Sequence, residues 1–176
     1  MRRRHRRPGS SRSRGVVASG ARLTSLATTS AALVGVLTAC TGPVDVTAPA
    51  PAGQAAERCS DLLAALPDEV AGQPRREVEP PDAPAAAWGD PAIVLTCGVE
   101  MPDGFDGFSS CQEVDGVGWY VPEEQFDPGS DVVLTTIGWS PAVRVEMPGD
   151  YRPPAELMVD LAPAITQTLT LDQPCL

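Results

Sequence analysis

Carboxylates are the side chains in this sequence best suited to chemistry, and many gather between residues 103 and 127. The stretch PDGFDGFSSCQEVDG holds Asp103, Asp106, Glu113 and Asp115, whose oxygens are ligands that calcium accepts. Their spacing differs from that of an EF-hand loop, which needs alternate acids, a glycine and a late glutamate. We weigh a calcium-binding module against a solvated acidic loop, and we expect the solvated loop without a metal site.

A second acidic group has the residue types of a glycoside hydrolase, in which two carboxyl groups flank the scissile bond. Glu123, Glu124 and Asp127 are close in sequence, with Tyr120 nearby. A general-acid carboxyl group usually lies in apolar surroundings, and no apolar stretch encloses these acids. A carboxylate-based cell-wall hydrolase is therefore the weakest of our functional hypotheses.

Other catalytic side chains are missing from the part of the sequence after the apolar run. His5 is the only histidine and precedes that run, and the chain has no lysine. Without imidazole there is no Ser-His-Asp or Cys-His centre, and zinc lacks its usual nitrogen ligand. Without lysine there is no Schiff base. We expect a protein that is not an enzyme and needs no cofactor.

Tryptophans beside turns are candidates for binding a ligand. Trp88 and Asp90, in the stretch WGDP, would present an aromatic platform and a carboxylate on a tight turn. The alternative is that Gly89, Asp90 and Pro91 only shape the entry to the next strand. Tryptophan is core by default, and of the three tryptophans Trp139, beside a predicted turn, has the best chance of being exposed. We retain Trp88, Asp90 and Trp139 as candidate ligand-facing residues.

Four further cysteines follow Cys40, namely Cys59, Cys97, Cys111 and Cys175. An even number in an exported chain indicates disulfides, and four cysteines allow three pairings. We expect Cys97 to pair with Cys111 around a loop rich in glycine and aspartate. Cys59 would then pair with Cys175 and join the two ends of the domain. No Cys-x-x-Cys occurs, and the spacings match no zinc pattern.

The first 39 residues read as an export signal. Eight of the thirteen basic residues and no acid precede Cys40, and the uncharged run 23–39 follows the basic part. This order is that of a secretory signal, and the run is shorter than the roughly 20 apolar residues of a spanning helix. Leu37-Thr38-Ala39-Cys40 resembles the bacterial lipobox, which implies a lipidated Cys40 on the extracytoplasmic face of the cell membrane. The alternative is an ordinary signal with an incidental cysteine.

The chain after the signal is strongly acidic. That part contains five arginines and all 23 acidic residues of the chain. Its formal net charge is therefore −18, compared with −10 for the whole chain. Such a surface repels nucleic acid. Residues 40–57 are rich in Pro and Ala, so we expect the lipidated cysteine and a flexible tether there. The remaining residues, 58–176, are enough for one globular domain.

Hydrophobic periodicity predicts an α+β domain, braced by disulfides, with one helix at each end. Between the helices we expect a mostly antiparallel sheet of about four to five strands, with both helices packed on one face. Pro163 should kink or split the second helix. The predicted helices lie in the stretches 59–70, where Pro67 ends the helix, and 153–171. The predicted strands are 75–81, 90–99, 113–121 (broken by glycines), 130–139 and 141–148.

The stretches AAWGDPAIVLTCGVEMP, CQEVDGVGW and TTIGWSPAVRVEMP resemble an uncharacterised actinobacterial lipoprotein family, domain of unknown function 3515. The resemblance spans roughly residues 59–165 and implies an envelope lipoprotein, without any activity. Our leading hypothesis is a non-enzymatic, membrane-anchored module that binds an envelope protein. A small-ligand or calcium-binding module is the alternative.

Overall fold

The computed structural model describes residues 42–175. This part of the chain contains two α-helices, α1 (Gln54–Ala65) and α2 (Ala155–Thr168). None of its helices is long and apolar enough to cross a membrane. The predicted signal, 1–39, and Cys40 lie outside the described residues.

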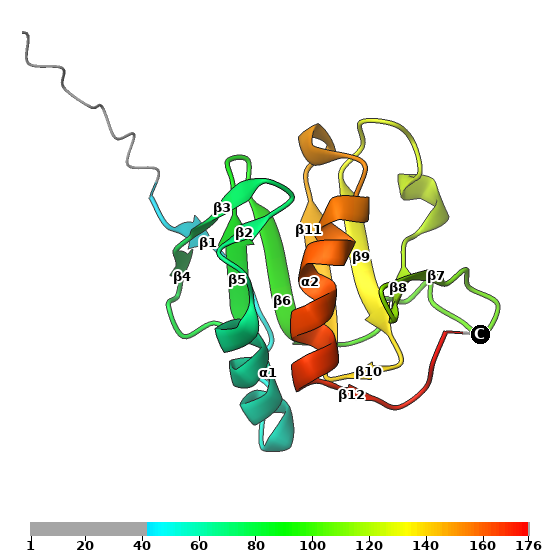
Figure 1. Cartoon of the computed structure of the whole chain (residues 1–176), viewed down its shortest axis with the longest axis horizontal. Coiled ribbons are helices and arrows are strands. Elements are labelled where there is room, and N and C mark those ends of the chain that lie inside the picture. Colours follow the sequence, from blue (N-terminus) through cyan, green and yellow to red (C-terminus); the bar gives the residue numbers. More distant parts are fainter. Residues whose placement is uncertain (1–41, 176) are drawn as a thin grey trace, which may run out of the picture. The chain divides into compact units, whose positions relative to one another are not determined.

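Eight strands form one antiparallel sheet, in the order β2-β3-β5-β6-β11-β9-β8-β7 (Figure 1). Two small pairs, β1 with β4 and β10 with β12, are separate from it. The strands and the two short 3₁₀ helices are β1 (Val44–Asp45), β2 (Glu69–Val70), β3 (Gln73–Arg76), β4 (Val78–Glu79), β5 (Ala85–Trp88), β6 (Ile93–Val99), β7 (Gln112–Val114), β8 (Val117–Tyr120), η1 (Glu123–Gln125), β9 (Val132–Ile137), β10 (Trp139–Ser140), β11 (Ala142–Met147), η2 (Gly149–Tyr151) and β12 (Thr170–Leu171).

The centre of the sheet follows the predicted alternation. Val145 on β11 pairs with Leu95 on β6 and with Leu134 on β9, and all three side chains are fully buried. Their neighbours Arg144 and Glu146 are directed to the other face and are partly or largely exposed. A strand with period-two alternation buries one face, and here that face meets the helices.

Both helices lie in front of the same face of the sheet (Figure 1). They contact each other, α1 also contacts β6, and α2 contacts β2, β7 and β8. Leu62 of α1 and Leu157, Leu161 and Ile165 of α2 join one core with the sheet. The predicted α+β class and antiparallel sheet are confirmed.

The predicted count of four to five strands is wrong, because short strands without strong β propensity complete the sheet. β5 is Ala-Ala-Ala-Trp, and alanine is depleted in strands, yet all four of its residues are buried between β3 and β6. The predicted single strand at 113–121 is two strands, β7 and β8. They turn at Asp115 and Gly116, whose φ angles of 50° and 82° suit the Asp-Gly hairpin signal.

The chain joins the fold earlier than the predicted boundary at residue 58. Helix α1 begins at Gln54, and Val44–Asp45 pairs in parallel with Val78–Glu79. The Val44 N–H donates to the Glu77 carbonyl at 2.8 Å. Residues 42–57 are therefore attached to the domain, which corrects the prediction of a free tether over this stretch.

Helix α2 continues through Pro163, although a kink or split was predicted. Proline removes the hydrogen bond to the carbonyl four residues earlier, here that of Val159. Pro163 is exposed and the Val159 side chain is 46% exposed, so this carbonyl lies on the water-facing side. Water can take the place of the missing donor there, and the buried face of the helix keeps its packing.

The disulfide pairing differs from our prediction. Cys59 bonds to Cys97, with Cα atoms 5.7 Å apart, and Cys111 bonds to Cys175, with Cα atoms 6.0 Å apart. The predicted Cys97–Cys111 bond fails because β6 and β7 are separated by three strands, roughly 19 Å at ~4.8 Å per spacing. A disulfide needs Cα atoms within about 7 Å.

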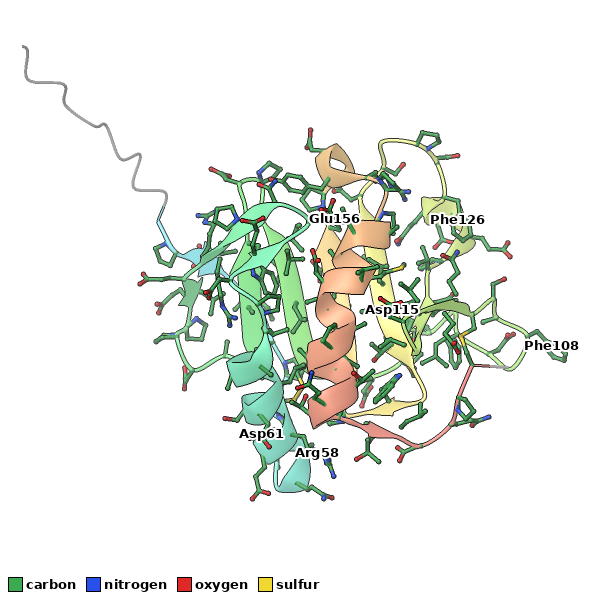
Figure 2. The ribbon with its side chains drawn as sticks, in the orientation of Figure 1. Arg58, Asp61, Phe108, Asp115, Phe126 and Glu156 are labelled. Atoms are coloured by element: carbon green, nitrogen blue, oxygen red, sulfur yellow. A yellow bond between two sulfur atoms is a disulfide. The ribbon has the colours of Figure 1, made fainter. Side chains whose placement is uncertain are left out.

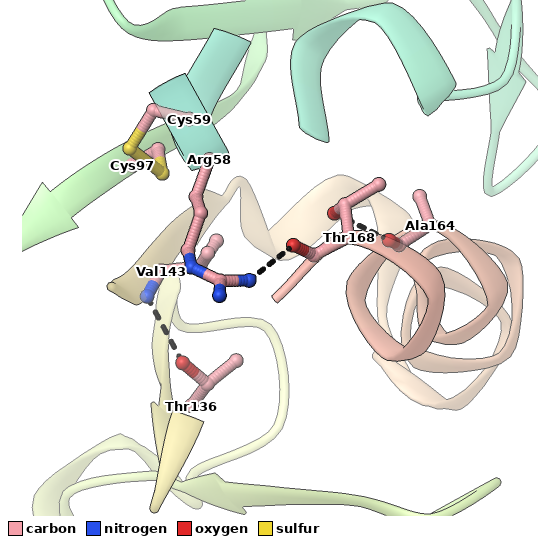
Figure 3. The surroundings of a disulfide bond; sticks show 7 residues. All are labelled: Arg58, Cys59, Cys97, Thr136, Val143, Ala164 and Thr168. Atoms are coloured by element: carbon pink, nitrogen blue, oxygen red, sulfur yellow. Dashed lines mark hydrogen bonds between the residues drawn. A yellow bond between two sulfur atoms is a disulfide. The ribbon is translucent and has the colours of Figure 1, made fainter. Parts of the chain in front are cut away.

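The Cys59–Cys97 bond ties α1 to the centre of the sheet (Figure 3). Both cysteines are at most 1% exposed. Beside them Arg58 donates to the Thr168 carbonyl at 3.2 Å, which joins α1 to the end of α2. This bond and the helix contacts fix α1 over β6.

Candidate functional site

The candidate ligand-facing tryptophans are buried, which corrects that prediction. Trp88 is fully buried, donates from Nε1 to the Pro67 carbonyl at 3.1 Å, and lies under the guanidinium of Arg75 at 5.5 Å. Trp139 is 8% exposed. Asp90 is exposed and lies 3.9 Å from the Arg76 guanidinium. The structure therefore favours the turn-shaping interpretation of the WGDP stretch.

The acids considered for calcium do not converge. Within residues 42–175 no group of three or more His, Cys, Asp or Glu side chains is placed to hold a metal ion. The acids considered for glycan hydrolysis, Glu123, Glu124 and Asp127, are all exposed. Tyr120 is buried and packs edge-to-face against Phe105, with ring centroids 5.4 Å apart.

All five arginine side chains in the described chain bind groups of the domain itself. Four of the five donate to backbone carbonyls, and Arg144 pairs with Glu146 at 3.1 Å. The backbone contacts are Arg58 to Thr168, Arg75 to Leu63 and Leu66, Arg76 to Gly42 and Gly89, and Arg152 to Ser130 and Gln125. Within residues 42–175 only two carboxylates, those of Asp90 and Glu146, lie within ion-pair distance of a cation. The acidic surface is therefore left uncompensated.

One end of the molecule combines this charge with exposed aromatic rings. Residues 100–131 contain nine acids and no basic residue, and all three phenylalanines of the chain lie there. Phe108 is 98% exposed and Phe126 is 47% exposed. Both lie at the β7 end of the sheet (Figure 2). We define the acid–aromatic surface by Asp103, Asp106, Phe108, Glu123, Glu124 and Phe126.

The loop that carries Phe108 has its own internal hydrogen bonds. The Phe108 N–H donates to Asp106 Oδ1 at 2.9 Å, and the Asp106 N–H donates to Ser109 Oγ at 2.9 Å. At the end of the loop Cys111 is tied to Cys175, and within it Phe105 packs on Tyr120. The Phe105 ring thus faces the domain, while Phe108, three residues later, is exposed to water.

A hollow of about 450 Å³ lies beside Phe108. One wall is the loop from Pro102 to Ser110, and the other is the segment from Tyr120 to Glu124. The lining includes Asp106, Glu123 and Glu124. The acid–aromatic surface is therefore concave next to its most exposed ring, a shape suited to a protruding basic side chain.

Comparison with known proteins identifies the family and nothing more. The model of a family described as "Protein of unknown function (DUF3515)" matches residues 21–174, most of the chain. The chain belongs to the DUF3515 family. No curated protein and no solved structure matches it.

A second hollow of this DUF3515 chain, about 680 Å³, lies at the other end of the sheet. Its walls are residues 46–51, helix α1 and the loop Pro80–Pro84. Proline and alanine dominate the lining, and Asp82 is its only charged residue. It offers no convergent acids, so it gives no support to a hydrolase or a calcium site.

Phe108 and Phe126 are the residues of this DUF3515 domain that the sequence reasoning missed. A phenylalanine in a loop usually anchors that loop, as Phe105 does. The signal available was the repeated Asp-Gly-Phe at 103–105 and 106–108, which puts two rings three residues apart in a polar loop. Only the fold decides which of the two rings packs against the domain.

Proposed function

We propose that this protein is an exported lipoprotein that binds a basic segment of another cell-envelope protein, without enzymatic activity. Its domain would be anchored through Cys40 on the extracytoplasmic face of the membrane. The partner would bind at the acid–aromatic surface.

The observation that carries this proposal is Phe108, which is 98% exposed in a segment, residues 100–131, that contains nine acids and no basic residue. Covering one phenylalanine is worth roughly 1.5–3 kcal/mol, and aromatic residues are common binding hot spots. An arginine of the partner would gain both charge attraction and a cation–π contact with the ring. Uncompensated acids further favour a basic partner and disfavour nucleic acid.

The cysteines support the anchor. All four cysteines after Cys40 are paired in two disulfides, as expected of a protein in an oxidising, exported environment. Cys40 is the fifth cysteine and immediately follows the apolar run. If Cys40 is lipidated, every cysteine from residue 40 onward has a role, either in the anchor or in a disulfide.

Replacing Cys40 with alanine is expected to release the protein from the membrane. Each buried methylene of a lipid anchor contributes ~0.8 kcal/mol, and two chains hold a protein firmly. Fractionation of cells that produce the wild type and the Cys40→Ala variant measures this directly. Membrane retention of the variant through high-salt washing would refute the lipid anchor.

Replacing Phe108 with serine is expected to weaken partner binding roughly tenfold or more, since about 1.4 kcal/mol corresponds to a factor of ten. Chemical cross-linking in living cells would join the protein covalently to its partner. The readout is the yield of this cross-linked product. Val159→Ser is the matched control, because Val159 is a 46% exposed apolar residue on α2. Equal loss in both variants would contradict a role for Phe108.

The contribution of charge to binding is tested separately, by the yield of the same cross-linked product. Neutralising four exposed acids of residues 100–131, three from the acid–aromatic surface and the neighbouring Asp127, should lower the yield and its salt dependence, because electrostatic attraction is screened by salt. Neutralising four exposed acids in and after α1 should leave the yield unchanged. The first set is Asp103→Asn, Glu123→Gln, Glu124→Gln and Asp127→Asn, and the second is Glu57→Gln, Asp61→Asn, Asp68→Asn and Glu69→Gln.

A further inference from the structure

The chain just after Cys40 is held at one end of the domain. The Val44 N–H donates to Glu77 at 2.8 Å, and the Val46 N–H donates to Glu79 at 2.9 Å. Arg76 binds the Gly42 carbonyl at 2.6 Å. These bonds attach residues 42–46 to β4 and β3.

The length of chain left for a tether is therefore short. Three residues separate Cys40 from Val44. At 3.3–3.6 Å per residue, four residue steps span at most about 14 Å. A free tether through residue 57 would have reached roughly 50 Å. A lipid on Cys40 would hold the β1–β4 pair next to the headgroups.

The acid–aromatic surface lies at the opposite end of the sheet. β4 contacts β5, near one edge, whereas β7 is the other edge strand. Five strand spacings separate β5 from β7, about 24 Å at ~4.8 Å each. Figure 1 shows the β1–β4 pair and β7 at opposite sides of the domain.

We propose that the anchor fixes the orientation of the domain, with the β1–β4 end at the bilayer and the acid–aromatic surface directed away from it. This inference rests on the proposed lipidation of Cys40. Anionic headgroups repel the nine acids of residues 100–131, and they also repel the acids beside the β1–β4 pair, namely Asp45, Glu77, Glu79 and Asp82. Only the β1–β4 end is held by the anchor, so the repulsion raises the far end. The partner would accordingly be met above the membrane surface, beyond the ~8 Å over which headgroup charge acts at physiological salt.

Energy transfer from two positions to the bilayer tests this orientation. The full-length lipidated protein is placed in phosphatidylcholine–phosphatidylglycerol vesicles that carry an acceptor dye on the headgroups. A donor is attached through p-azidophenylalanine at position 82, which lines the hollow beside residues 46–51, or at position 108. We expect the donor at 108 to lie roughly 20 Å farther from the headgroups than the donor at 82.

A control insertion defines the role of the short connection. Sixteen Gly/Ser residues placed between Thr41 and Gly42 should largely abolish the difference between the two donors, because the domain is then free to tumble. Equal distances without the insertion would overturn the orientation while leaving the anchor intact. Failure of the lipidated protein to float with the vesicles would overturn the anchor itself.

Discussion

Removal of the Cys59–Cys97 disulfide is expected to lower the free energy of unfolding by about 4 kcal/mol. The bond closes a loop of 38 residues, for which the chain-entropy model gives ~4 kcal/mol at 25 °C. Both residues are at most 1% exposed, so a Cys59→Ala/Cys97→Ala variant also loses core packing. Urea unfolding of the variant and the wild type measures the difference.

Single variants test the connectivity itself. With the pairing seen here, Cys59→Ala leaves one free thiol, at Cys97, and Cys111→Ala leaves one at Cys175. Alkylation followed by peptide mass spectrometry locates each thiol. A free Cys175 thiol in the Cys59→Ala variant would show that the ends of the domain are joined, and the account of the fold would be wrong.

Alanine at Gly138 is expected to cost about 3 kcal/mol or more, among the larger effects of single substitutions. The Gly138 φ angle is +74°, and an added Cβ would overlap the Gln173 carbonyl oxygen. The Gly138 carbonyl also accepts hydrogen bonds from the N–H groups of Asp172 and Gln173, at 2.8 and 3.2 Å. The substitution would therefore displace the C-terminal segment that Cys175 ties to Cys111.

Gly116→Ala is the matched control for this prediction. Its φ angle is +82°, but an added Cβ there meets nothing within 4 Å. It should cost only the strain of a left-handed backbone, roughly 1 kcal/mol. Thermal unfolding compares the two, and we expect Gly138→Ala to melt well below Gly116→Ala. Equal melting temperatures would contradict the close contact at Gln173.

The parts of the fold that sequence predicts are those set by local pattern. Val143, Val145 and Met147 alternate with polar residues, and β11 follows them closely. The Ala-Ala-Ala-Trp strand carries no such pattern, because its burial comes from the strands on both sides. Disulfide pairing likewise depends on which strands are neighbours in the sheet. Our prediction relied on the spacing of the cysteines along the chain, and it therefore named the wrong partners.

The candidate site was predictable only in its charge. The excess of acids is plain from composition, whereas the exposure of Phe108 depends on how Asp106 and Ser109 fold the loop. That most of these acids have no ion-pair partner is also visible only in the structure. Four of the five arginines in the described chain donate to backbone carbonyls, namely Arg58, Arg75, Arg76 and Arg152.

Position-specific photo-cross-linking in living cells tests the central claim most directly. A photoreactive phenylalanine analogue replaces Phe108 in the full-length chain, and the same analogue at Val159 of α2 serves as the control. We predict one recurrent envelope protein captured from position 108 and not from 159, through a segment rich in arginine or lysine. The same products from both positions, or none from 108 in membrane-anchored protein, would contradict a partner at the acid–aromatic surface.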